Sequence, residues 1–311
     1  MGNRIRKLDS QKAKRNPLYL MAQGLLLLTN RKHPFVIATA GPQRRKITMF
    51  LNRFNRPILK KSALIVMGGF FANRIKDDFA YQDALKQYRT IYVETNMMLD
   101  ELTQLGFDNV AVYPNCRKRP VTEMTVASSP DHSQPLRCLF FSLVSPDKGA
   151  DLILEAAKGM PDVQFDFYGE IDPTYKETFL QEIQQIPNAA YGGVFQVKGD
   201  NVYGKLNEYD VLLLPTKCTT EGVPGILVEA KIAAIASIVS HISYNSEIVE
   251  DGVSGIVLKE NTVDDLVNSI IQLNQDRMLL QQLKHGALAS AEQYYIDRYM
   301  DDFLNNLEED K

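Results

Sequence analysis

Short apolar runs alternate with longer segments of helical periodicity along most of the chain. In the second half, residues 138–144, 163–168 and 211–214 are apolar, branched and bounded by turn residues, which is typical of buried strands. Residues 150–158 and 174–186 have apolar positions three and four apart, as amphipathic helices do. Strands that alternate with helices predict a parallel sheet with crossover helices. The other elements predicted in this half are strands 189–194, 237–240 and 256–258 and helices 262–273, 277–293 and 297–307.

The first half shows the same alternation. Its predicted strands are 35–39, 63–67, 90–93 and 110–113, and its predicted helices are 45–51, 77–87 and 96–105. Residues 123–135 are rich in Ser, Pro, Thr and Asp, as a linker would be. We therefore expect an α/β protein with two Rossmann-like parallel-sheet domains, residues 1–122 and residues 136–293.

Composition agrees with this expectation. The chain has 311 residues, of which 45% are hydrophobic and 23% charged, so it can bury the cores of two domains. Its three cysteines lack paired spacing and its four histidines form no ligand pattern. This argues against a zinc site or a disulfide scaffold and fits a reducing cytosol.

Charge is distributed unevenly along the chain. Residues 1–61 contain 15 Lys and Arg and one acidic residue, whereas the rest of the chain has 20 basic and 37 acidic residues. Such a basic segment attracts a membrane leaflet, a lipid diphosphate or nucleic acid. Nucleic acid is the least favoured, because no recognition motif or interleaved aromatic residues accompany the charges. A solvated basic face without a partner is the alternative.

An apolar run at residues 18–28 also lies in this basic part. It is about half the length needed to span a bilayer. No small-residue cleavage site follows it, as one would after a signal peptide. We therefore predict a buried or interfacial helix.

The predicted strand 211–214 leads into the sequence EGVPGILVE at residues 221–229. Pro224 suits the first turn of a helix, and the glycines leave the end of that helix open. Free N–H groups and the helix dipole make such an end an anion site. Glu221 and Glu229 bracket this site. Carboxylates beside a phosphate are electrostatically unfavourable unless they serve a neighbouring polyol.

Several other segments accompany this pair of glutamates. They are Lys148-Gly149 ahead of helix 150–158, Tyr168-Gly169-Glu170 after strand 163–168, Asp210 before strand 211–214, and YNSEIVEDGVSG at residues 244–255. Together with the E-x7-E spacing, they resemble the retaining, nucleotide-sugar-dependent glycosyltransferases of the GT-B fold (family 4, or group 1), in the version found in bacterial capsule and exopolysaccharide enzymes. The resemblance covers about residues 88–275.

The resemblance implies two domains facing a cleft, with the nucleotide-sugar donor on the C-terminal domain and residues 294–311 returning to the N-terminal one. It makes Glu221 and Lys148 the catalytic residues: Lys148 neutralises the departing diphosphate and Glu221 approaches the sugar. Glu229 would accept hydrogen bonds from the ribose. The implied donor-binding residues are Glu229, Gly222, Val223, Pro224, Gly225, Ile226, Gly169 and Glu247, and the acceptor-side or membrane residues are Gly68, Gly69, Arg44, Arg45 and Lys46.

Plainer interpretations exist for three of these residues. Lys148 would be a solvated surface lysine, Glu229 an exposed helix carboxylate, and Glu247 a cap for its own helix. The resemblance further implies no metal and no cofactor, with a UDP- or GDP-sugar as substrate. It also implies a lipid-linked saccharide as acceptor and a peripheral location at the cytoplasmic face of the membrane.

Two departures from the family pattern leave other functions open. Leu143 stands where the family has the arginine of its diphosphate clamp, and the chain opens at what resembles the end of the family's first β-α unit, so the N-terminal domain is expected to be shortened. One alternative is a weak or inactive relative that binds a nucleotide sugar or a partner transferase. A less favoured alternative is a GT-B nucleotide-sugar epimerase.

Overall fold

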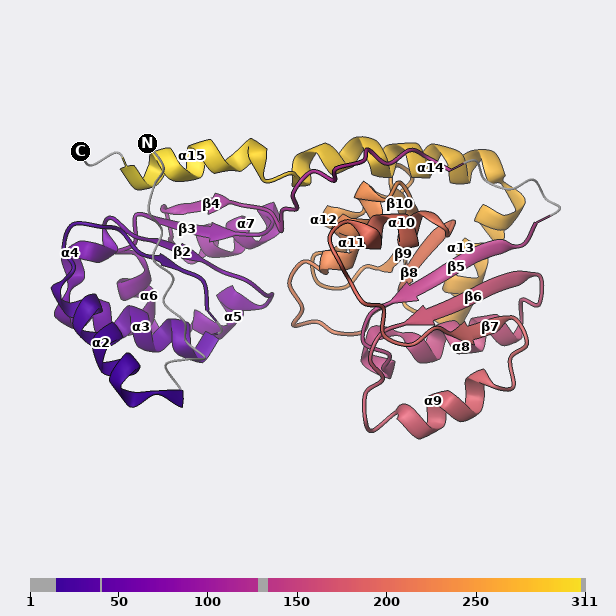
Figure 1. Ribbon diagram of the computed structural model, residues 1–311, viewed down its shortest axis with the longest axis horizontal. Coiled ribbons are helices and arrows are strands. Elements are labelled where there is room, and N and C mark those ends of the chain that lie inside the picture. Colours follow the sequence, from indigo (N-terminus) through magenta and orange to yellow (C-terminus); the bar gives the residue numbers. More distant parts are fainter. Residues whose placement is uncertain (1–14, 40, 128–133, 309–311) are drawn as a thin grey trace.

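The computed structural model describes residues 15–39, 41–127 and 134–308. These residues form two α/β domains, each built on one parallel sheet (Figure 1). In the described part of the chain, the first sheet has the strand order β1-β2-β3-β4 and the second has the order β10-β9-β8-β5-β6-β7. The predicted fold class, two parallel-sheet α/β domains, is confirmed.

The first domain has short strands and mostly short helices. Its strands are β1 (Val36–Ile37), β2 (Ala63–Ile65), β3 (Thr90–Val93) and β4 (Val110–Val112). Its helices are α2 (Pro17–Thr29), α3 (Gly41–Phe54), α4 (Arg56–Leu59), α5 (Phe71–Ile75), α6 (Phe79–Leu85) and α7 (Asn96–Gln104). Helices α4 and α5 were not predicted, because helices of four or five residues have too little periodicity to detect.

The second domain contains the larger sheet. Its strands are β5 (Leu136–Phe141), β6 (Val163–Tyr168), β7 (Ala189–Tyr191), β8 (Val211–Leu214), β9 (Ala236–Ser240) and β10 (Gly255–Leu258). Its helices are η1 (Pro146–Lys148), α8 (Ala150–Lys158), α9 (Lys176–Ile183), α10 (Asn201–Asn207), α11 (Gly225–Ile232), α12 (Asn245–Ile248), α13 (Val263–Gln275), α14 (Arg277–Ser290) and η2 (Ala291–Tyr294).

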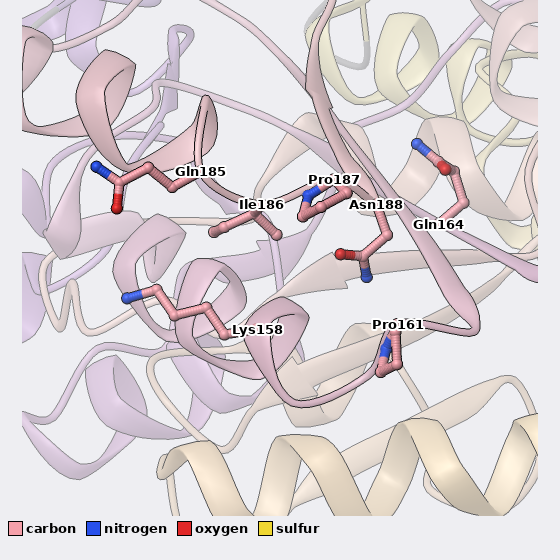
Figure 2. A pocket seen from close by; sticks show the side chains of 7 residues that line it. All are labelled: Lys158, Pro161, Gln164, Gln185, Ile186, Pro187 and Asn188. Atoms are coloured by element: carbon pink, nitrogen blue, oxygen red, sulfur yellow. The ribbon is translucent and has the colours of Figure 1, made fainter.

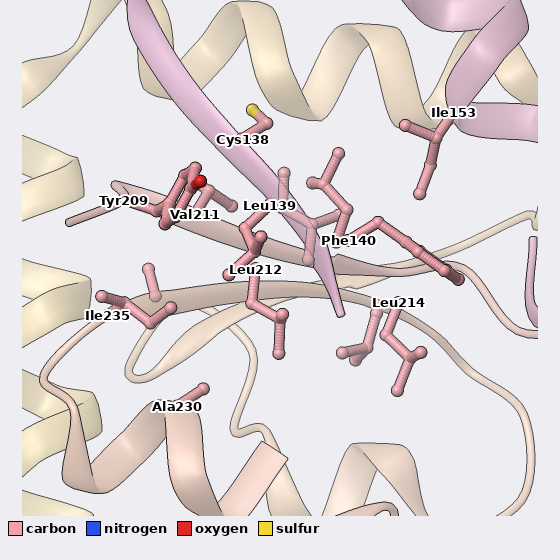
Figure 3. Close-up of a cluster of buried hydrophobic side chains, with 14 of the residues drawn as sticks. Cys138, Leu139, Phe140, Ile153, Tyr209, Val211, Leu212, Leu214, Ala230 and Ile235 are labelled. Atoms are coloured by element: carbon pink, nitrogen blue, oxygen red, sulfur yellow. The ribbon is translucent and has the colours of Figure 1, made fainter. Parts of the chain in front are cut away.

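Strand β8 lies at the centre of this domain and all four of its residues are buried. Figure 3 shows Leu212 and Leu214 among the side chains of β5 and of the helix that carries Ala230. Burial on both faces explains why this strand reads as a continuous apolar run. Asp210, just before it, pairs with the buried Lys284 of α14 at 3.5 Å, and its carboxylate also accepts a hydrogen bond from the Arg137 N–H at 3.0 Å. Asp210 therefore helps to hold β5, β8 and α14 together.

The last helix, α15 (Asp297–Glu308), lies along the first domain (Figure 1). Arg89 donates a hydrogen bond to the Asn306 carbonyl at 2.6 Å, and the Asn306 amide donates to the Tyr92 hydroxyl at 3.1 Å. The ring of Phe303 contacts Tyr92 and Tyr113, with centroids 5.1 and 5.4 Å apart. The end of the described chain thus packs on strands β3 and β4.

Two local predictions need correction. Strand β5 ends at Phe141 rather than at residue 144, and the Leu143 side chain is 42% exposed. Leu143 is therefore neither a strand residue nor core, and an arginine there would not be buried. Helix α2 has no buried residue, and Leu18, Met21 and Leu25 are 77%, 70% and 62% exposed, so the predicted buried form of this helix is wrong.

Candidate functional site

The two domains meet where the carboxyl ends of both sheets face each other. The loop after β2 carries Gly68 and Gly69, and the loop after β8 leads to Glu221 and Gly222. A Cβ on Gly69 would lie 2.1 Å from the Glu221 carbonyl oxygen, and a Cβ on Gly222 would lie 2.7 Å from the Gly68 Cα. The backbones of the two loops are therefore in direct contact, and side chains larger than hydrogen would separate the domains.

Lys148 is brought to this loop by a turn that requires glycine. Gly149, which follows the 3-10 helix η1, has φ +81°, and a Cβ there would lie 2.2 Å from the Pro215 carbonyl oxygen. The adjacent Lys148 ammonium forms a largely buried ion pair with Glu221 Oε1. The other carboxylate oxygen of Glu221, Oε2, is buried and has no hydrogen-bond partner among the described residues. An unused, buried acceptor beside a cation is suited to a substrate hydroxyl.

Glu229 lies on the second turn of α11 and pairs with Arg117 rather than pointing into solvent. Arg117 Nε donates to Glu229 Oε1 at 3.1 Å, and both side chains are about one-quarter exposed. Arg117 Nη1 donates to the Asn115 side chain at 2.8 Å. Its Nη2 donates no hydrogen bond within the described chain and would lie 2.4 Å from a Cβ at Gly225, the first residue of α11. Each glutamate of the pair therefore has its own cation.

The start of α11 offers two unused backbone donors. Pro224 is the N-cap, with φ −62° and ψ 116°, and it contributes no N–H. The Leu227 N–H donates to the Pro224 carbonyl at 3.0 Å. Within the described ranges, the N–H groups of Gly225 and Ile226 have no acceptor. Together with the helix dipole, these free donors are what the anion site predicted at this helix end would require.

A second buried carboxylate, Glu94, faces the same loops from the end of β3. It is 8% exposed and accepts a hydrogen bond from the Gly68 N–H at 3.2 Å. Burial raises the pKa of Glu94 above its ordinary value, while the Gly68 and Val223 N–H groups and the Arg117 charge oppose that rise. Asn115 donates to the Val223 carbonyl at 3.2 Å. Val223 is thus held by the first domain and the segment after it, and is 7% exposed.

The polar groups of Gly169 and Glu247 are engaged by other parts of the protein, within the second domain for Gly169 and across the interface for Glu247. The Gly169 N–H donates to the Gly193 carbonyl at 2.9 Å, and its own carbonyl accepts from the Tyr191 hydroxyl at 2.8 Å. The Glu247 carboxylate accepts hydrogen bonds from the N–H groups of Asn96 and Met97 at 2.6 and 2.9 Å. Glu247 therefore caps helix α7 of the other domain, neither its own helix nor the donor segment. This corrects both interpretations of Glu247.

The predicted basic cluster on α3 is only partly at the surface. Arg45 and Lys46 are exposed, and Arg45 pairs with Asp78 at 2.7 Å. Arg44 is 4% exposed, with its guanidinium carbon 4.4 Å from the centroid of the Phe71 ring. Arg44 faces inward because α3 turns that side of the helix toward α5. It must therefore be removed from the predicted exposed face.

A pocket of about 430 Å³ on the second domain is lined by none of these residues (Figure 2). It is lined by Lys158, Pro161, Gln164, Gln185, Ile186, Pro187 and Asn188. These residues end α8 or lead into β6 and β7, so the pocket is at the amino edge of the sheet. The Asn188 amide already donates to the carbonyls of Ala157, Met160 and Val163. Ligands of parallel sheets bind at the carboxyl edge, so we do not place the site here.

Comparison with known families identifies the class of protein. The sequence model for "Glycosyl transferases group 1" matches residues 126–289, which is more than half of the chain. The chain belongs to this glycosyltransferase family. No curated protein sequence matches this group 1 chain significantly.

Solved structures share the GT-B fold with this group 1 chain. HepE from Anabaena, in complex with UDP, is 14% identical with a TM-score of 0.73, over 96% of this chain and 84% of that chain. Pneumococcal GtfA, in complex with UDP and GlcNAc, is 18% identical with a TM-score of 0.69, over 94% and 59%. S. aureus TarM is 19% identical with a TM-score of 0.61, over 79% and 50%, so the group 1 chain spans about half the length of TarM. Identities this low show the fold alone.

Two findings concern metals and membranes. The described residues contain no group of three or more His, Cys, Asp or Glu side chains that could hold a metal ion. No helix in the described ranges is both long and apolar enough to cross a bilayer.

Sequence interpretation missed three residues of the site: Glu94, Asn115 and Arg117. Asn115 and Arg117 follow β4, between the last predicted strand of the first domain and the predicted linker. Glu94 directly follows the short strand β3 and has no motif around it. These residues reach the α11 loop from positions more than 100 residues earlier in the sequence, so only the folded chain reveals them.

Proposed function

We propose that this group 1 glycosyltransferase transfers a sugar from a nucleotide-sugar donor to an acceptor bound against the first domain. The observation that carries the proposal is the arrangement at α11, where two unused N–H groups are flanked by Lys148 with Glu221 and by Arg117 with Glu229. The positive helix end and the cations suit a diphosphate, whereas the carboxylates suit the hydroxyls on either side of it.

Different residues of the chain would bind the donor and stabilise the leaving group. The Gly225 and Ile226 N–H groups, with Lys148 and Arg117, would neutralise the charge that grows on the departing nucleoside diphosphate. The free Oε2 of Glu221 would accept a hydrogen bond from the donor sugar, and Glu229 would accept from the ribose hydroxyls. Contact between the Gly68-Gly69 loop and the Glu221-Gly222 loop would exclude water from the reacting sugar.

The finer details rest on the family resemblance. We infer that the anomeric configuration is retained and that no metal is required, because the sequence has no Asp-x-Asp ligand pair. UDP is the first nucleotide to test, since HepE and GtfA are seen with UDP. A lipid-linked saccharide of surface polysaccharide biosynthesis is the proposed acceptor.

Two observations favour a second candidate function, a nucleotide-sugar-binding relative with little or no turnover. Leu143 lacks the charge of the family's clamp, and Pro224 lacks an N–H at the start of α11. Both reduce the number of contacts with a leaving diphosphate. If the protein is an active transferase, Arg117 supplies the positive charge that the family's clamp arginine would provide.

Transfer of radiolabelled sugar from a panel of UDP- and GDP-sugars to bacterial lipid extract tests the two candidates directly. We expect a labelled lipid product that persists in excess EDTA and falls at least about 100-fold in Glu221→Gln, since that variant loses charge at the reacting sugar. The exposed Glu177→Gln, distant from the cleft, is the control. Nucleotide binding without any product would support the inactive relative, and an altered free nucleotide sugar without acceptor would indicate an epimerase.

Arg117→Gln should distinguish a diphosphate contact from a structural one. We expect the Kd for UDP to rise about 10- to 100-fold, because a hydrogen bond to a charged group is worth about 1.5–3 kcal/mol. The Kd for uridine should change less than about 3-fold. Calorimetry for UDP and NMR titration for uridine provide the two values.

The control for Arg117 is Lys118→Gln, an exposed neighbour that loses the same charge. If the Kd values for UDP and uridine rise by the same factor, Arg117 acts only by orienting Glu229 toward the ribose. Unchanged UDP affinity would mean that Arg117 only connects the segment after β4 to α11 and does not contact the nucleotide.

The exposed side of α2 supports a peripheral location on an anionic membrane. Leu18, Met21 and Leu25 are among its exposed residues, and Arg31 and Lys32 are exposed just after the helix. Its other side faces the protein, where the Leu27 carbonyl accepts a hydrogen bond from Asn55 at 2.7 Å. An apolar face beside cations is complementary to the acidic headgroups and acyl chains of a bilayer surface. We therefore propose the cytoplasmic face of the cell membrane as its location.

Binding to vesicles that contain phosphatidylglycerol should depend on this helix. Changing Leu18, Met21 and Leu25 together to Ser should lower the partition coefficient by more than about 10-fold, because each buried Leu contributes about 1.5–3 kcal/mol. Raising the salt concentration should also weaken binding. Val121, Val197 and Met278, which are likewise exposed, provide the control triple change to Ser. Equal binding by both triple variants, measured by co-sedimentation, would refute the proposed surface.

A further inference from the structure

The buried Arg44 lacks a counter-ion among the described residues. Its Nε and Nη1 atoms are buried and have no hydrogen-bond partner in the described part of the chain. Burial also lowers the pKa of this guanidinium from its ordinary value, and the nearby Tyr81 hydroxyl, which is neutral, opposes that shift only in part. The Phe71 ring, 4.4 Å from the guanidinium carbon, offsets part of the cost through its negative face. A buried cation with unused donors nevertheless remains unfavourable until an anion joins it.

Arg44 points back to the beginning of its own helix. Helix α3 has 14 residues, begins at Gly41 and has no acidic residue in its first turn. A Cβ on Gly41 would lie 3.8 Å from Arg44 Nη2 and 3.9 Å from Nη1 of Arg74, which belongs to α5. Two guanidinium groups therefore converge on the positive end of a helix. Gly41 is partly exposed and Arg74 is exposed, so a solute can reach this point.

The charges around Arg44 and Arg74 do not cancel the positive potential at the start of α3. Asp78 is engaged by Arg45, with Nε and Oδ2 2.7 Å apart. Tyr81 and Tyr88 also face Arg44, and burial raises the pKa of both, so their phenols stay neutral at physiological pH. The adjacent Lys46 is exposed and adds a further positive charge. The net charge around the start of α3 is therefore positive, which favours an anion with several acceptor oxygens.

We propose that the start of α3, with Arg44 and Arg74, binds a phosphate group of the acceptor. Helix α3 follows β1, and Arg74 lies on α5 just after the Gly68-Gly69 loop that contacts the donor segment. This anion site therefore lies at the same sheet edge as the cleft, on the acceptor side. A lipid-linked saccharide carries a diphosphate between lipid and sugar, so its assignment as ligand rests on the proposed function.

The test measures anion binding to the full-length protein with the donor site already filled. In saturating UDP, inorganic pyrophosphate should raise the melting temperature of the wild type in a concentration-dependent way. Arg44→Met should raise the Kd for pyrophosphate at least about 10-fold, because it removes charge-assisted hydrogen bonds to the anion. It should also melt no lower than the wild type without anion, since it removes an unpaired buried charge. Lys176→Met, which removes the same charge from an exposed position on α9 of the second domain, should leave pyrophosphate affinity unchanged.

Arg74→Gln provides a second variant, because an exposed position tolerates substitution. This variant should also raise the Kd for pyrophosphate. Equal affinity in the wild type, Arg44→Met and Arg74→Gln would overturn the site. Geranyl diphosphate tests the source of the phosphate: binding at least as tight as that of pyrophosphate supports a lipid-linked acceptor. If only inorganic pyrophosphate binds, the acceptor assignment is overturned. Failure of UDP to bind would count against the proposed function alone, since pyrophosphate can be titrated without it.

Discussion

Two carboxylates beside a phosphate-binding helix end would repel the anion that the site must hold, unless each is neutralised. The rest of the cleft depends on how this constraint is met. Lys148 reaches Glu221 from within the second domain, through a turn that only glycine at position 149 permits. Arg117 reaches Glu229 from the segment after β4. The pair of glutamates is thus balanced from both sides, and one buried oxygen of Glu221 has no hydrogen-bond partner among the described residues.

This balance also ties the two domains together. Arg117 and Asn115 lie on the segment that leaves the first sheet, and both contact the α11 region of the second domain. Glu247 caps α7, and the Tyr244 hydroxyl donates to the Glu101 carboxylate at 3.1 Å, so contacts run in both directions. Because the loops of the proposed donor site also form the interface between the domains, donor binding would be coupled to the contact between the domains.

Much of the second domain could be predicted from the sequence, because its strands are buried on both faces and read as apolar runs. Strands β6 and β8 and helix α8 have the predicted bounds. The end of β5 was misjudged because the apolar run continues through Val144, which still forms an isolated bridge to Ile171, although the continuous strand ends at Phe141. Hydropathy alone does not reveal where pairing stops.

The first domain and the site were harder to predict for a different reason. Arg44 was assigned to a basic surface, since charge in a sequence says nothing about which side of α3 faces inward. Lys148 was predicted as a site residue from a family motif, although not as the partner of Glu221, whereas Arg117 depends on a tertiary contact between distant segments. Short elements such as α5, which carries Arg74, lack a periodic signal.

The central claim is that a nucleoside diphosphate binds at the start of α11. Titration of isotope-labelled protein with UDP, followed through assigned backbone amide signals, tests it most directly. The Gly225 and Ile226 amides, which have no acceptor in the described chain, should show the largest shifts, because their N–H groups acquire phosphate oxygens. Shifts confined to the pocket around Lys158 and Asn188, with Gly225 and Ile226 unmoved, would contradict the account.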